Sequence, residues 1–186
     1  MKEIVPSFCA SSSLLISLLL AFLCISPTQS RLVVKITDDV LNDICSRTED
    51  PSSCLQALKS DPRTATTDFY GLAQVSINLA NATVNETHTM IMSQLDQTMD
   101  PKLQDQYTQC LEFYDNAIGD IEYGSENWSS KDYLALDAAS SACMTDITDC
   151  KDVTTETSSF LPRQNNKSYQ LCKIMLLIAQ CLYRKI

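Results

Sequence analysis

Cysteine is the residue type whose number and spacing in this sequence could do chemistry. The 186 residues include nine cysteines. Cys45 and Cys54 are only 9 positions apart, with Pro51 between them, and this spacing suits a disulfide that closes a small helical hairpin. Cys110 and Cys150 are 40 positions apart, an interval that can tie two successive long helices together. These intervals predict a cross-linked framework rather than an active site.

No other set of residues predicts catalysis or metal binding. His88 is the single histidine and lies in a polar stretch, so we expect a solvated side chain without the partners that catalysis requires. A Cys-x-x-Cys motif is absent, which excludes thioredoxin-like redox chemistry and ordinary zinc ribbons. The carboxylates are scattered over polar faces, as is typical of solvated surfaces. We therefore predict no catalytic residue, no metal ligand and no cofactor.

The N-terminal residues 1–30 are typical of a secretory signal peptide. The stretch Leu14–Ile25 is almost wholly apolar, and the small residues Thr28 and Ser30 suit the −3 and −1 positions of a cleavage site. A dozen apolar residues are too few to cross a bilayer, which needs roughly 20, so a membrane anchor is the less favoured alternative. We expect a mature chain over residues 31–186, secreted to the extracellular cell-wall space and not bound to a membrane.

Cleavage at this position would leave seven cysteines and an acidic chain. Lys2 and Glu3 cancel, so the net charge stays at −9, which argues against binding nucleic acid or anionic membranes. Disulfides persist in the oxidising compartments that a secreted chain reaches. The same route exposes the chain to glycosylation, and four Asn-x-Ser/Thr sequons are predicted sites: Asn81, Asn85, Asn127 and Asn166.

The scarcity of turn residues predicts an all-α fold. The sequence has only three glycines, and three Asp-Pro pairs combine an N-cap with a proline in the first helical turn. Apolar residues at helical spacing predict a hairpin over Ile36–Lys59 and four long helices. These helices run from Thr66 to about Leu95, from Pro101 to a loop at Gly124–Ser130, from a Ser130 cap through Cys150, and from about Lys167 onward. Short connections favour antiparallel neighbours, so we predict a helical hairpin (31–62) followed by an up-and-down four-helix bundle (63–186).

Several motifs of this sequence resemble those of the plant invertase and pectin methylesterase inhibitor family. They are Cys45-x8-Cys54, the phrase Leu58-Lys59-Ser60-Asp61-Pro62-Arg63-Thr64-Ala65, Leu72-Ala73, Cys110 and Cys150. The resemblance covers about residues 33–184. The stretch Ser130-Lys131-Asp132-Tyr133 looks most like the sycamore-pollen-allergen branch, whose members are usually named as invertase inhibitors.

The resemblance implies a non-catalytic protein that binds a secreted carbohydrate-active enzyme one-to-one and covers its cleft. In this family a helical face of the bundle blocks pectin methylesterase, whereas a short Pro-Lys-Phe segment blocks invertase. Lys131, Asp132 and Tyr133 stand near the matching position, so a cation and an aromatic are kept but the proline is not. These three are the candidate target-binding residues. We favour pectin methylesterase slightly, with acid invertase as the alternative and a secreted helical signalling or ligand-carrying protein as the rival class.

The resemblance also implies disulfides between the first and second and between the third and fourth conserved cysteines. Antiparallel counting about the loop near Ser125–Ser129 places Cys110 opposite residue 144 and favours Cys143, whereas the family pattern favours Cys150, which we adopt. Three cysteines then remain, Cys143, Cys172 and Cys181. The sequence leaves the pairing of these three open, and for a cysteine that stays unpaired we expect a buried thiol rather than a redox sensor. At least one of them must stay unpaired, so a dimer through that thiol is an alternative to the expected monomer.

Overall fold

Two short helices, α2 (Asp38–Cys45) and α3 (Pro51–Ser60), open the computed structural model, which describes residues 35–154 and 160–184. The expected signal peptide over residues 1–30 lies outside the described part of the chain, and its cleavage stays a prediction. All named elements of the described part are helices, as the shortage of turn residues predicted.

A helix cap and a disulfide close the α2–α3 hairpin. The Asp50 side chain accepts a hydrogen bond from the backbone N–H of Ser53 at 3.0 Å, and Pro51 occupies the first turn of α3, where its missing N–H is not needed. Cys45 and Cys54 form a disulfide with 5.5 Å between their Cα atoms, and both are buried. The pair expected from its short spacing is therefore present.

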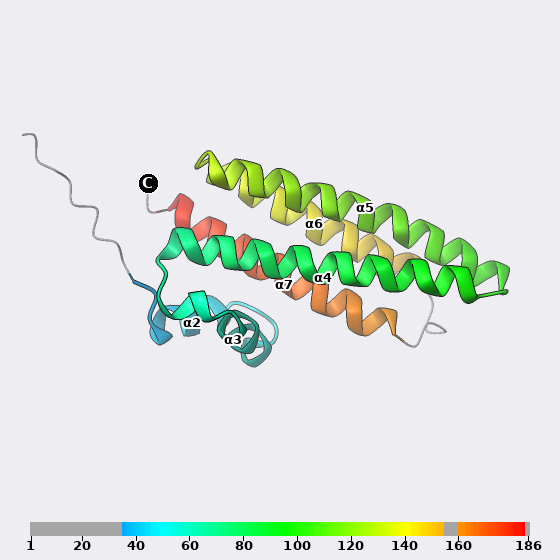
Figure 1. Cartoon of the computed structure of the whole chain (residues 1–186), viewed down its shortest axis with the longest axis horizontal. Helices are drawn as coiled ribbons and strands as arrows, with labels where there is room; N and C mark the ends of the chain where they lie inside the picture. Colours follow the sequence, from blue (N-terminus) through cyan, green and yellow to red (C-terminus); the bar gives the residue numbers. More distant parts are fainter. Residues whose placement is uncertain (1–34, 155–159, 185–186) are drawn as a thin grey trace, which may run out of the picture. The chain divides into compact units, whose positions relative to one another are not determined.

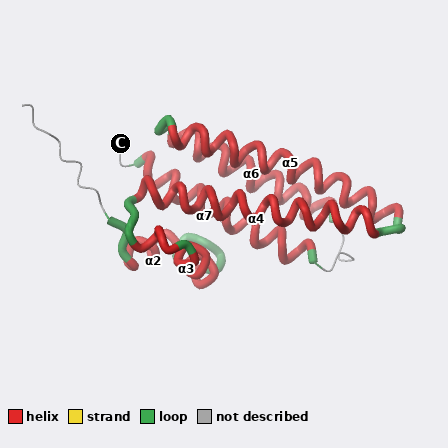
Figure 2. The backbone as a smooth tube through the Cα atoms, in the orientation of Figure 1, coloured by secondary structure: helices red, strands yellow, loops and turns green. Residues whose placement is uncertain are grey.

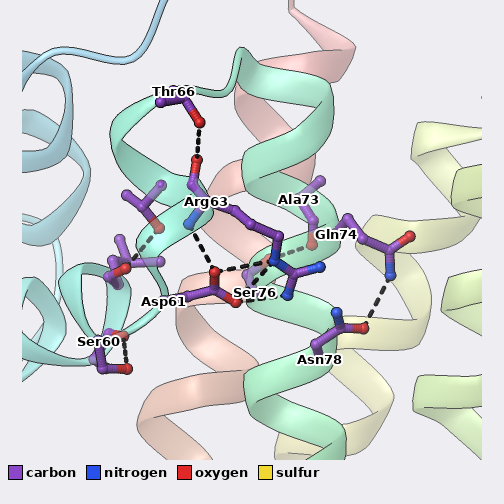
Figure 3. A network of polar contacts seen from close by, with 11 residues as sticks. Ser60, Asp61, Arg63, Thr66, Ala73, Gln74, Ser76 and Asn78 are labelled. Atoms are coloured by element: carbon purple, nitrogen blue, oxygen red, sulfur yellow. Dashed lines mark hydrogen bonds and ion pairs between the residues drawn. The ribbon is translucent and has the colours of Figure 1, made fainter.

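A single 3₁₀ turn, η1 (Pro62–Ala65), connects this hairpin to the bundle. Asp61 accepts a hydrogen bond from the backbone N–H of Arg63 at 2.9 Å and also pairs with the Arg63 guanidinium (Figure 3). The backbone N–H of Ile36 donates to the carbonyl of Thr67 at 3.1 Å, so the segment before α2 is tied to the start of the bundle. Polar contacts thus hold both the segment before α2 and the segment after α3.

Four long helices form the bundle: α4 (Phe69–Gln97), α5 (Pro101–Ser129), α6 (Tyr133–Val153) and α7 (Leu161–Tyr183). Each packs against its neighbour in sequence, and α7 also packs against α4, so the contacts close a ring in the order α4, α5, α6, α7 (Figures 1 and 2). The side made by α4 and α7 therefore lies opposite the side made by α5 and α6. Helices α2 and α3 both contact α7, and α3 also contacts α4.

The predicted loop over Gly124–Ser130 was wrong, because α5 continues through it to Ser129. Gly124 is buried where α5 crosses α6 closely, and a Cβ added there would lie 3.1 Å from Leu136 Cδ1 and 3.2 Å from Ala139 Cβ. Its role is close helix packing rather than a turn. The cap of α6 is Asp132 and not the expected Ser130.

Helix α7 begins at Leu161, six residues before the expected start near Lys167. Its first two turns bury the polar side chains of Gln164, Asn165 and Ser168 among the core residues. These polar residues interrupt the apolar pattern, which is why periodicity placed the start of the helix too late.

Two disulfides cross-link the bundle. Cys110 of α5 is bonded to Cys150 of α6 with 4.6 Å between their Cα atoms, the partner that the family pattern favoured over Cys143. Cys143 is bonded instead to Cys172 of α7, with 6.4 Å between the Cα atoms. The sequence left the pairing of these two cysteines open, and the structure joins them to each other. Cys181, half-buried on α7, is the free cysteine among the described residues.

A buried polar network crosses the core next to the α5–α6 disulfide. The Tyr114 hydroxyl donates to Asn165 Oδ1 at 2.8 Å, and Asn165 Nδ2 donates to Cys150 Sγ at 3.5 Å. Burial raises the pKa of Tyr114 to about 12, although hydrogen bonds with Ser168 and Thr87 oppose the rise. The tyrosine therefore stays a neutral donor and links α5 to α7 in one register.

Candidate functional site

Two surfaces of the bundle have features suited to binding a partner. One is the turn between α5 and α6, which carries the predicted residues Lys131, Asp132 and Tyr133. The other is a groove along the outer side of the same two helices, which the sequence did not reveal.

The turn is fixed by backbone hydrogen bonds that end α5. The N–H of Lys131 donates to the carbonyl of Trp128 at 3.0 Å, and the N–H of Asp132 donates to the carbonyl of Asn127 at 2.9 Å. This pattern is a Schellman motif, which places Lys131 in the left-handed region with φ of 65°. A residue with a Cβ is disfavoured there by about 1–2 kcal/mol, and glycine is the usual occupant. The side chain of Lys131 is therefore presented from a rigid, strained position.

Only two of the three candidate residues face the solvent. Lys131 and Asp132 are exposed, and Asp132 accepts a hydrogen bond from the backbone N–H of Ala135 at 3.0 Å as the cap of α6. Tyr133 is 9% exposed and packs within the hydrophobic core. The cation of this segment is available to a partner, whereas the aromatic ring supports the fold.

An aromatic stack anchors the turn to the beginning of α4. The rings of Trp128 and Tyr70 stack with 4.4 Å between their centroids, and Trp128 Nε1 donates to the Tyr70 carbonyl at 3.1 Å. Leu134, directly after the turn, is 56% exposed. This end of the bundle therefore offers a cation and an apolar side chain on a rigid support.

The second surface is a shallow acidic groove between α5 and α6. Gly119 lies in it, and a Cβ added to this glycine would meet nothing within 4 Å. Polar and acidic side chains line the groove on both helices. The lining residues are Asp115, Asn116, Gly119 and Asp120 of α5 with Ala142, Thr145 and Asp146 of α6.

Two carboxyl groups meet across this groove. Burial is the largest of several effects that together raise the pKa of Asp146 to about 7, the others being its hydrogen bond with Asp120 and the charges of Asp120 and Asp149. Burial also raises the pKa of Asp120. Because two hydrogen-bonded carboxyl groups cannot readily both be charged, the pair shares a proton in mildly acidic solution.

The edge of the groove is fixed by a polar side-chain contact between two helices. His88 Nε2 of α4 lies 3.0 Å from Asp115 Oδ1 of α5. The expectation of a solvated histidine was wrong, since its side chain is only 20% exposed and paired. Its role here is to hold Asp115 at the border of the groove.

The four sequons fall at three places on the bundle. Asn81 and Asn85 are exposed on α4, Asn166 is exposed on α7, and Asn127 is half-buried near the end of α5. Asn127 Nδ2 donates to the Tyr123 carbonyl at 2.8 Å. None of the four lines the acidic groove.

The described residues contain no group of histidine, cysteine or carboxylate side chains arranged to hold a metal ion. Nor does any described helix combine the length and the apolar composition needed to cross a bilayer.

Sequence reasoning missed the acidic groove because its residues look like ordinary surface. The signal that could have found it is spacing: Asp115, Gly119 and the neighbouring Asn116 and Asp120 recur at intervals of four on one face of α5. To predict which face of α6 lies beside that face of α5, the position of the turn between the two helices must be known. The sequence placed this turn too early.

Comparison with known proteins identifies close resemblances over most of the chain. The family described as "Plant invertase/pectin methylesterase inhibitor" matches residues 39–178. A "Pectinesterase inhibitor" of Actinidia deliciosa is 40% identical over 180 residues, covering 95% of this chain and 96% of that protein. A "Putative invertase inhibitor" of Platanus acerifolia is 28% identical over 156 residues, covering 79% of this chain and 87% of that protein.

Solved structures agree with the sequence relatives. The crystal structure of a mutant form of a pectin methylesterase inhibitor from Arabidopsis superimposes with a TM-score of 0.69 at 26% identity. The match covers 75% of this chain and 95% of that one.

Proposed function

The chain belongs to the plant invertase/pectin methylesterase inhibitor family, and from this membership we propose that it inhibits pectin methylesterase by forming a one-to-one complex. Members of the family are inhibitors and not enzymes. The observation that carries the choice of target is the 40% identity to a pectinesterase inhibitor over 95% of the chain.

The complex forms on the groove between α5 and α6. The groove is acidic, and the net charge of the whole chain is −9, so the surface complements a basic region beside the active-site cleft of an enzyme. The two helices that form it are joined by the Cys110–Cys150 disulfide. Little ordering is therefore needed on association, which favours binding.

A titration of enzyme activity tests this function. The purified protein is added to pectin methylesterase and, separately, to acid invertase, and residual activity is plotted against the molar ratio. We expect a linear loss of esterase activity that ends near equimolar inhibitor, with no turnover of either substrate by the protein alone. Full activity of both enzymes at excess inhibitor would contradict the proposal and favour the signalling or ligand-carrying alternative.

A matched pair of variants tests the binding face. Thr145 in the groove and Thr89 on α4 are both exposed, and each hydroxyl donates to the carbonyl four residues earlier. Thr145→Arg introduces a cation where we expect the basic partner, and should weaken inhibition of the esterase at least tenfold, or about 1.4 kcal/mol. Thr89→Arg makes the same chemical change on another helix and should leave inhibition unchanged. Equal effects of the two variants would exclude the groove as the binding face.

Acid invertase is the second candidate target because Lys131 is exposed on a rigid turn and a Platanus relative is named as an invertase inhibitor. Were invertase the target, Lys131→Ala should weaken its inhibition by about 1–3 kcal/mol, the range of interface hot spots. Lys102→Ala, an exposed lysine at the other end of α5, is the control. Tyr133 is unsuitable for this test because it is buried.

The protein acts outside the cell as a monomer in this proposal. The apolar segment within residues 1–30 and the three disulfides of the described chain support secretion to the cell-wall space. We also propose that the mature protein consists of a helical hairpin that ends at residue 62 and a bundle that follows it. Cys181 is half-buried, so a dimer through this thiol remains the alternative, to be detected as a reducible species of double mass.

A further inference from the structure

Two sequons that are far apart in the sequence lie against each other in the fold. Asn85-Glu86-Thr87 belongs to α4 and Asn166-Lys167-Ser168 belongs to α7. Their middle residues form an ion pair, with Lys167 Nζ 3.3 Å from Glu86 Oε2. Their hydroxyl residues meet in the core, where Thr87 Oγ1 lies 3.3 Å from Ser168 Oγ. The two asparagines are therefore held at the same level of the bundle on neighbouring helices.

A third sequon adjoins them on α4. Asn81 lies one helical turn before Asn85, and Asn85 Nδ2 donates to Asn81 Oδ1 at 2.8 Å. Both asparagines and Asn166 are exposed, whereas the hydroxyl residues of the three sequons, Thr83 among them, are buried. The asparagine side chains that would accept glycans thus point to solvent, while the hydroxyl residues of the same sequons are buried in the core.

The helices that bear these asparagines form the side of the bundle opposite α5 and α6. Asn81 lies at the border of this side with α5, where it lines a shallow depression with Glu122 and Ser125. The α2–α3 hairpin packs on the same two helices, α4 and α7, so part of this side is already covered by protein. Attached glycans are bulky and polar, and they would shield the exposed remainder.

We propose that Asn81, Asn85 and Asn166 carry N-linked glycans that cover the α4 and α7 side of the bundle and its border with α5, and leave the α5–α6 groove as bare protein surface. The part that concerns enzyme binding rests on the proposed function. The donor is an oligosaccharide linked through pyrophosphate to a lipid. The asparagine Nδ2 forms a bond to C1 of the first sugar, the bond from C1 to the pyrophosphate oxygen breaks, and the amide proton lost leaves with the lipid pyrophosphate. One N–H remains on the modified amide. Asn85 can therefore keep its hydrogen bond to Asn81.

Mass measurement tests the modification itself. The full chain is expressed in a eukaryotic secretory host, and the secreted protein is weighed before and after treatment with peptide N-glycosidase. Asn81→Gln, Asn85→Gln and Asn166→Gln should each remove one glycan while leaving the buried hydroxyl in place. Asn78→Gln, an exposed asparagine of α4 outside any sequon, should remove none. Unmodified Asn85 and Asn166 in the secreted protein would overturn the proposal.

Shielding of the α4 and α7 side by glycans is measured by hydroxyl-radical oxidation. The glycosylated protein is compared with the same protein after its glycans have been removed enzymatically. Met92 of α4 is 45% exposed and lies two turns beyond Asn85, whereas Leu134 of α6 is 56% exposed. Stripping should raise oxidation of Met92 severalfold and leave Leu134 unchanged. Equal changes at the two residues would show that the glycans do not cover the α4 and α7 side. This readout is independent of any enzyme target.

A new glycan on the opposite side tests the bare groove. Ile118→Thr turns Asn116, which lines the groove, into a sequon, and the double variant Asn116→Gln/Ile118→Thr carries the same core change without an acceptor. We expect the glycosylated single variant to lose inhibition at least tenfold and the double variant to keep it. Removal of the glycans at Asn81, Asn85 and Asn166 should change inhibition less than twofold. A tenfold effect of stripping the natural glycans would overturn the proposed arrangement, whereas failure of every form to inhibit either enzyme would count against the proposed function alone.

Discussion

At the residue scale, Lys131 is the described residue whose backbone conformation is least suited to its side chain. The Schellman motif that ends α5 holds it at φ of 65°, where glycine is normally found. Strain of this kind is often kept at functional positions. A lysine at this point is consistent with a side chain that is retained for binding rather than for stability.

Lys131→Gly should therefore stabilise the fold while removing the cation. We expect the free energy of unfolding in urea to rise by about 1 kcal/mol, because glycine adopts this conformation without the Cβ clash. Lys131→Ala keeps the clash and should not raise stability. A lower stability of the glycine variant would show that the lysine side chain contributes contacts that outweigh the strain.

The carboxyl pair in the groove makes stability depend on pH. The raised pKa of Asp146, about 7, means that the native state holds a proton that the unfolded chain releases near pH 4. The native state then binds more protons than the unfolded state across this interval, so the stability contributed by the pair falls as pH rises from about 4 to 7.

Asp146→Asn removes this titration. We expect the variant to match the unmodified protein near pH 4, to be the more stable of the two at pH 7, and to show a shallower slope of unfolding free energy between these values. Asp152→Asn, on the same helix and exposed, removes one charge without touching the pair. A slope unchanged by Asp146→Asn would mean that the pair does not share a proton.

At the scale of elements, the position of one turn explains what the sequence could and could not predict. The helical hairpin, the four amphipathic helices and their order follow from periodicity and from the Asp-Pro caps. Gly124 suggested an early turn because glycine is common both in turns and where two helices touch, and only the packing against Leu136 distinguishes the two uses. Counting from the actual turn centre near Ser130 places Cys110 opposite Cys150, so the error in pairing by simple counting has the same origin.

The candidate binding residues were predictable only in part, for a related reason. Lys131 and Asp132 lie at the turn and are exposed, as a loop segment predicts, whereas Tyr133 begins a helix and turns into the core. The groove depends on the pairing of two helical faces, and no single segment of sequence contains that information.

The polar network between α5 and α7 should be essential to their register. Tyr114→Phe removes the donor to Asn165 Oδ1 and leaves a buried acceptor unpaired, which costs about 1–3 kcal/mol of stability. Phenylalanine fills the same space, so packing is preserved. The loss is measured by urea unfolding, with Tyr123→Phe as the control because Tyr123 is exposed. No loss at Tyr114 would show that Asn165 finds another partner.

The bond between Cys143 and Cys172 should stabilise the contact of α6 with α7. It closes a loop of 29 positions, for which chain entropy gives about 3–4 kcal/mol, and Cys143→Ala/Cys172→Ala should lose that amount. Cys181→Ala should lose much less, because its thiol is free. Peptide mapping without reduction checks the pairing, and a peptide joining Cys110 to Cys143 would contradict it.

At the scale of the whole molecule, the two sides of the bundle differ in what they carry. The α4 and α7 side packs against the hairpin and bears three sequons, while the α5 and α6 side carries the acidic groove. In the proposed arrangement, the negative charge of the chain would attract a basic enzyme from a distance, and the bare groove would then determine where it binds.

The distribution of the disulfides divides the described part of the chain into two covalent blocks. One bond lies within the hairpin, the other two join α5, α6 and α7, and α4 contains no cysteine. The peptide link through Met99, which is 92% exposed, is then the sole covalent connection between the blocks among the described residues. A protease site inserted after Met99 and cut in the folded protein should yield two bands on a non-reducing denaturing gel, whereas a cut at Lys131 should yield one. The groove would remain a single covalent piece after the first cut, so inhibition would outlast the integrity of the backbone.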